Sequence, residues 1–121
     1  MRKGGRWELA LDLLNEFKIW SRPDTISYSA AISCCEKGGR WDLALELLNE
    51  CKTWSAPDTI SYNAAISACE KGGRWELALE LLNECKTWSA PNTISYNAAI
   101  SACEKGGRWE LALELLNECR T

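Results

Sequence analysis

Residues 59–92 read TISYNAAISACEKGGRWELALELLNECKTWSAPN, and copies of this stretch fill the chain. The copy at 25–58 differs from it at four positions, and the copy at 93–121 matches it at 28 of 29 aligned positions. Trp7, Trp41, Trp75 and Trp109 mark the same period of 34 residues. A fixed period of this length predicts a repeat protein, in which neighbouring copies stack and bury a continuous core.

Each copy contains two amphipathic patterns separated by a pair of glycines. The spacing i, i+3, i+4 and i+7 predicts a first helix over 59–71 and a second over 74–86. Gly72-Gly73 separates them, because glycine takes the left-handed conformation without a Cβ penalty. Pro91 closes the turn into the next copy. The residues expected to be buried are Tyr62, Ala65, Ile66 and Cys69 in the first helix, and Trp75, Ala78, Leu79, Leu82 and Cys85 in the second.

The predicted fold is all-α: an α-solenoid of helix-turn-helix repeats, wound into a right-handed superhelix. We expect residues 1–24 to form a half repeat, with a second helix over 6–18 and a turn. Residues 25–58 and 59–92 form full repeats, and 93–121 form a repeat without its final turn. The chain is therefore expected to be a fragment of a larger protein, or a designed or recently duplicated array. Its uncovered terminal helices could associate end to end.

The composition argues against several functional classes. The net charge of −3 and the pI near 5.0 do not favour nucleic-acid binding, which needs basic residues gathered locally. Seven cysteines, without histidine or a C-x-x-C spacing, predict buried thiols rather than a metal site or a disulfide framework. No apolar run is long enough for a membrane span. No nucleophile has a base beside it, so we expect no catalysis and no cofactor.

The opening of each first helix points to one kind of solenoid. A period of 34 is the tetratricopeptide length, but that repeat wants a small glycine where Ile66 stands. The string Thr59–Ile66, TISYNAAI, instead resembles the opening of the pentatricopeptide repeat, roughly VVTYNTLI. The resemblance continues through Cys69, Lys71, Gly73, Arg74, Ala78, Leu81 and Pro91.

Two departures accompany this resemblance. The family repeat is typically 35 residues long, so one residue is missing from the turn near 86–90. This shortening could shift the last residue of each repeat relative to its first helix. The methionine usual late in the second helix is replaced by Cys51, Cys85 and Cys119, and by Phe17 in the first copy.

One face of each first helix carries residues suited to a single-stranded nucleotide. Ile60, Asn63, Ser67 and Lys71 lie at offsets 0, 3, 7 and 11, opposite the buried stripe, and are expected to be exposed. Isoleucine can pack on a base, an amide can donate and accept, and an ammonium can meet a phosphate. Physical reasoning alone leaves another interpretation open, because Asp24, Asp58 and Asn92 are also good N-cap residues.

The resemblance implies a role for these positions. In the pentatricopeptide family the fifth and last residues of each repeat select a base. By that rule Ser29 with Asp58 favours a purine, G above all, and Asn63 with Asn92 a pyrimidine, C above all. Asn97 lacks a partner. The expected site comprises Ser29, Asp58, Asn63, Asn92 and Asn97 for base reading, Ile26, Ile60 and Ile94 for base packing, and Lys37, Lys71 and Lys105 for phosphate.

The function implied is sequence-selective binding of single-stranded RNA, by a piece of a larger RNA-processing factor. The resemblance also suggests a mitochondrion or chloroplast as its location. The alternative is a tetratricopeptide-like scaffold that holds a protein partner in its groove.

Overall fold

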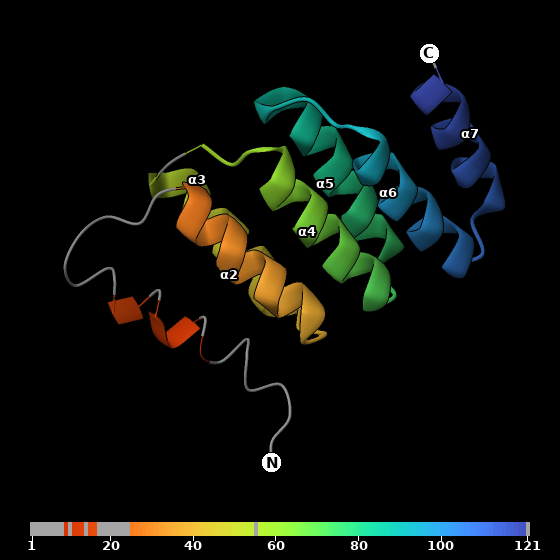
Figure 1. Ribbon diagram of the computed structural model, residues 1–121. Coiled ribbons are helices and arrows are strands. Elements are labelled where there is room, and N and C mark those ends of the chain that lie inside the picture. Colours follow the sequence, from red (N-terminus) through yellow and green to blue (C-terminus); the bar gives the residue numbers. More distant parts are fainter. Residues whose placement is uncertain (1–8, 10, 14, 17–24, 55, 121) are drawn as a thin grey trace.

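The computed structural model describes residues 9, 11–13, 15–16, 25–54 and 56–120 (Figure 1). Of the helix expected over 6–18, the described residues are all helical. The rest of that helix, the turn that follows it and the expected N-cap Asp24 lie outside the described residues.

Six helices have defined bounds, and no strand occurs among the residues described. The first helices of the repeats are α2 (Thr25–Lys37), α4 (Thr59–Lys71) and α6 (Thr93–Lys105). The second helices are α3 (Trp41–Trp54), α5 (Trp75–Trp88) and α7 (Trp109–Arg120). The chain is an all-α solenoid, as predicted.

The bounds expected for the second helix were wrong at both ends. Arg74 is the N-cap rather than the first helical residue, and α5 continues through Trp88, which we had placed in the turn. The helix ends only at Ser89, whose backbone is extended and whose N–H donates to the Cys85 carbonyl at 2.7 Å. Nothing before Ser89 breaks the helix, because Pro91 restricts only the residue directly before it.

The helices form two layers: in Figure 1, α2, α4 and α6 lie side by side along the array, and α3 and α5 lie behind them. The first-helix row consists of α2, α4 and α6, each packed against the next. Behind it, each second helix packs against the first helix of its own repeat, and α3 and α5 also pack against that of the next. Neighbouring repeats are therefore joined chiefly through the first-helix row, where the expected RNA-binding residues lie.

The core lies between the two layers. Tyr62, Ala65, Ile66 and Cys69 are fully buried, as their spacing predicted. On α5 the buried residues are Ala78, Leu81, Leu82 and Cys85, whereas Leu79 and Trp75 are partly buried. Burying side chains of this size stabilises the fold by about 1.5–3 kcal/mol for each large aliphatic or aromatic residue.

The Trp41, Trp75 and Trp109 column is not part of the fully buried core, which corrects our expectation. The Trp41 ring covers Gly72, the first glycine of the next repeat, so closely that a Cβ there would lie 2.4 Å from Trp41 Cδ1. The guanidinium carbon of Arg74 lies 4.6 Å from the centroid of the same ring. Trp109 is 64% exposed, since no described turn follows it. The column thus joins successive repeats; Trp7 lies outside the described residues.

Candidate nucleic-acid interface

The first-helix row presents an isoleucine from each repeat to solvent. Ile26, Ile60 and Ile94 are 75%, 65% and 63% exposed, respectively. Each lies two residues before a tyrosine of the same helix: Tyr28 and Tyr62 are fully buried, and Tyr96 is partly buried against the core. The isoleucines therefore lie on the side of the helices away from the second-helix row, where their spacing placed them.

The two complete pairs of proposed base-reading residues are in direct contact. Ser29 Oγ donates to Asp58 Oδ1 at 3.2 Å, and Asn63 Nδ2 donates to Asn92 Oδ1, also at 3.2 Å. The fifth and last residues of a repeat thus meet at its junction with the next repeat. The missing residue in the turn has not separated them.

The last residue of each repeat is also an N-cap. Asp58 Oδ1 accepts from the backbone N–H of Ser61 at 2.9 Å, and Asn92 Oδ1 accepts from that of Ser95 at 3.1 Å. The capping interpretation is therefore correct for both residues. It does not compete with base reading, because the cap occupies a single oxygen and leaves the second polar atom of each side chain.

The exposure of the fifth residues differs from our expectation of one uniformly exposed face. Ser29 is buried, at 8% exposure, and Asn63 is half-buried, whereas Asn97 is exposed. The reason is the neighbouring first helix: α4 covers Ser29 and α6 covers Asn63, but among the described residues no further first helix packs against α6 to cover Asn97. Position along the array, as well as sequence, determines how far each of these side chains is open.

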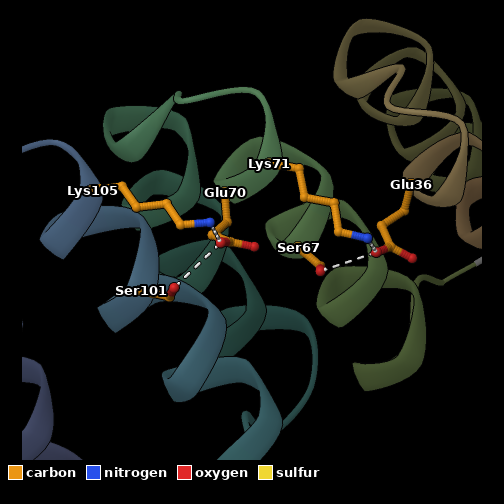
Figure 2. Close-up of polar contacts among 6 residues, drawn as sticks. All are labelled: Glu36, Ser67, Glu70, Lys71, Ser101 and Lys105. Carbon is orange, nitrogen blue, oxygen red and sulfur yellow. Dashed lines mark hydrogen bonds and ion pairs between the residues drawn. The ribbon is translucent and has the colours of Figure 1, made fainter.

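Two of the three lysines expected to bind phosphate form ion pairs within the protein (Figure 2). Lys71 Nζ donates to Glu36 of the preceding repeat, and Lys105 Nζ donates to Glu70 in the same way. Each glutamate is only 13% exposed, whereas the lysine side chains are 48% and 54% exposed. A phosphate would therefore meet a lysine that already has a carboxylate partner.

A serine hydroxyl completes each of these contacts. Ser67 Oγ donates to Glu36 Oε2 at 3.3 Å, and Ser101 Oγ donates to Glu70 Oε2 at 3.2 Å (Figure 2). Our reasoning from sequence missed these glutamates. The available signal was a Glu-Lys dipeptide at the end of every first helix, which supplies opposite charges at each junction between repeats.

The second-helix row carries a parallel set of ion pairs. Lys52 Nζ lies 2.5 Å from Glu84 Oε2 of the next repeat, and Lys86 pairs with Glu118. Glu84 also accepts from the buried Tyr62 hydroxyl at 3.4 Å. Glu84 therefore links two repeats and contacts the core.

The buried thiols are not suited to nucleophilic or metal chemistry. Burial raises the pKa of Cys35, Cys51 and Cys69 to about 11, so these groups stay protonated near neutral pH. The described residues contain no cluster of three potential metal ligands. None of the described helices combines the length and the apolar character that crossing a membrane requires.

Comparison with known proteins agrees with this architecture. The family model described as PPR repeat matches residues 26–55, 60–89 and 94–121. A search of curated proteins finds no match to the chain. Repeats of this kind are typically linked to RNA binding, and they generally form non-catalytic binding scaffolds. Because the three matches cover most of its length and its helices stack as a solenoid, the chain belongs to the pentatricopeptide repeat family.

Proposed function

We propose that the chain is a sequence-selective module for single-stranded RNA, in which the first-helix row reads one base per repeat, and that it is part of a larger RNA-processing factor. The observation that carries this proposal is the contact between fifth and last residues. Ser29 meets Asp58, and Asn63 meets Asn92, each pair beside an exposed isoleucine. An unstacked base could pack one face on the isoleucine while the paired polar groups hydrogen-bond its edge.

The four differences between the two full repeats support selectivity. Two of them fall on the pair itself, at Ser29/Asn63 and Asp58/Asn92. The first pair contains a carboxylate and the second contains two amides, so their hydrogen-bonding capacities differ. Repeats that are otherwise almost identical would therefore prefer different bases.

Electrostatics should keep the affinity of this chain low. The net charge is −3, and Lys71 and Lys105 are already paired with glutamates. Phosphate contacts supply most of the sequence-independent affinity for nucleic acid. Binding is thus expected to be weak and tightest at low ionic strength, with a shallow dependence on salt, because the salt slope grows with the number of phosphate contacts.

A titration with short RNAs tests the proposal. Fluorescence anisotropy at low salt would compare single-stranded RNAs of equal length that differ in two adjacent bases, with G and C in both orders among them. The double variant Asn63→Ser/Asn92→Asp turns the second pair into the first, and should change the preferred base from C to G. The matched control Asn49→Ser/Asn83→Asp makes the same changes at exposed positions of the second helices and should change neither base.

Two outcomes would refute different parts of the proposal. RNA is rejected as the ligand if no RNA binds at low salt, either to this chain or to an array lengthened with further copies of 59–92. Selective binding of extended peptides would then favour the tetratricopeptide-like alternative. If RNA binds but the preferred base is the same after the Asn63→Ser/Asn92→Asp exchange, RNA remains the ligand and the assignment of the reading pair is rejected.

A further inference from the structure

A buried serine from the following repeat lies beneath each reading pair. Ser61 and Ser95 are the third residues of α4 and α6, and both are fully buried. Ser61 contacts both members of the pair before it, Ser29 and Asp58. Ser95 contacts both members of the next pair, Asn63 and Asn92. The same arrangement therefore occurs at two successive junctions.

The contacts at Ser95 determine how both amides are turned. The backbone N–H of Ser95 can only donate, so the Asn92 atom that faces it at 3.1 Å must be the oxygen. That oxygen also faces Asn63 at 3.2 Å, so Asn63 turns its Nδ2 toward Asn92. Asn63 Oδ1 then accepts from the Ser95 hydroxyl. The Ser95 oxygen itself accepts from the backbone N–H of Asn92 at 3.1 Å, which completes the network.

This network leaves an outward edge rich in donors. The oxygens of Asn63 and Asn92 are both engaged, whereas Asn63 Nδ2 keeps one N–H and Asn92 Nδ2 keeps two. An edge of N–H donors complements a base that offers adjacent acceptors. Cytosine does so with its O2 and N3 atoms.

The contacts at Ser61 leave hydrogen-bond acceptors, rather than donors, on the outward edge of the pair Ser29 and Asp58. Asp58 Oδ1 accepts from the Ser61 N–H and hydroxyl, each at 2.9 Å, and from Ser29 at 3.2 Å. The oxygens of Ser29 and Ser61 lie 2.5 Å apart, and either hydroxyl can be the donor. The single Ser29 proton goes to Ser61 or to Asp58 Oδ1, so in both cases it is directed inward. Asp58 Oδ2 has no hydrogen bond to any described residue. The outward edge therefore consists of acceptors, which complement the N–H groups of a guanine.

We infer that Ser61 and Ser95 are positioning residues for base selection: by binding the inner atoms of the preceding pair, each serine determines which polar atoms that pair presents to RNA. This inference rests on the proposed function. It adds that the unit reading one base includes a residue of the next repeat. Neither serine touches the base.

The test combines a measurement without RNA and one with RNA, on the full chain. In Ser95→Ala the Asn63 oxygen loses its donor, so the side-chain NH₂ signals of Asn63 and Asn92 in ¹⁵N NMR should shift and exchange faster. Discrimination between C and the other bases at that repeat should fall about 2- to 10-fold, the range expected for one hydrogen bond. Discrimination at the base read by Ser29 and Asp58 should not change.

Three further variants make the result specific. Ser61→Ala should weaken G selection and leave C selection intact, which reverses the pattern of Ser95→Ala. Ser95→Thr keeps the hydroxyl and should retain both the NMR signals and the selectivity. Ser101→Ala removes a serine of the same helix that contacts Glu70 instead, and should affect neither base. Circular dichroism checks that each variant keeps its helical content.

The inference is overturned if Ser95→Ala leaves the Asn63 side-chain signals unchanged, or if it shifts them while base discrimination persists. Its failure is distinct from failure of the proposed function. Absence of RNA binding by the unaltered chain rejects the proposed function and with it any role in selection. Under that outcome the NMR measurement still decides whether Ser95 holds the amides.

Discussion

The ion pairs of the first-helix row should compete with RNA, and removing them should strengthen binding. Replacing Glu36 and Glu70 with glutamine keeps an acceptor for Ser67 and Ser101 but releases Lys71 and Lys105 from a charged partner. The net charge also rises by two, from −3 to −1. We expect tighter RNA binding at a small cost in stability.

The magnitudes follow from the exposure of the lysines, which are 48% and 54% open to solvent. An ion pair at this exposure contributes about 0–1 kcal/mol, so the double variant should lose at most about 2 kcal/mol of unfolding free energy. If RNA recovers about 1–2 kcal/mol from the released lysines, its affinity rises about 5- to 30-fold. Two added phosphate contacts would steepen the plot of log K against log salt by about 1.4.

The assay is RNA anisotropy at several salt concentrations, combined with urea unfolding. The matched control is Glu46→Gln/Glu80→Gln, which changes the net charge equally at exposed positions of the second helices. Equal gains in both double variants would show that only overall charge matters. An unchanged salt slope in Glu36→Gln/Glu70→Gln would show that the lysines do not reach phosphate, and would refute the reasoning.

Three further predictions concern stability. Gly72→Ala should cost about 1–3 kcal/mol, because its Cβ would lie 2.4 Å from the Trp41 ring, and Trp41→Ala should relieve most of this cost. Gly73→Ala should cost about 1–2 kcal/mol with or without Trp41, because the φ of +73° at this position strains any residue with a Cβ. Urea unfolding of the single and double variants distinguishes the steric effect at Gly72 from the backbone strain at Gly73. Burial raises the pKa of the Cys35 and Cys69 thiols from 9.0 to about 11, so the unfolded chain loses these protons at lower pH than the folded chain does. The unfolding free energy should therefore fall as the pH rises from about 9 to 11. Urea unfolding across that range tests this, and a stability that rises with pH would contradict it.

The architecture could be predicted because each signal lies within a short stretch of sequence. The apolar stripe around Tyr62 and Ile66, the glycine pair and the caps Asp58 and Asn92 are features of a short stretch of sequence, and they need no knowledge of how neighbouring repeats pack. The errors in the predicted helix bounds were local as well. The second helix runs on to Trp88 because no residue before Ser89 ends it.

The contacts between repeats could not be predicted in the same way. Whether Lys71 reaches Glu36 depends on the angle and offset between α2 and α4, which the 34-residue period does not determine. The burial of Ser29 has the same origin, since α4 must approach closely to cover it. Ser61 and Ser95 carried one usable signal: a small polar residue that is constant at the third position beside a fifth position that varies.

That constancy has a consequence for how the array could change its target. A reading pair that depended on a variable residue of the next repeat could not be altered without altering its neighbour. Here the supporting residue is serine in every copy, at Ser27, Ser61 and Ser95, and a hydroxyl can both donate and accept. The same serine therefore supports a carboxylate at Asp58 and an amide at Asn92. Two substitutions within one repeat are then sufficient to invert the polarity of its pair, and the junction itself stays unchanged.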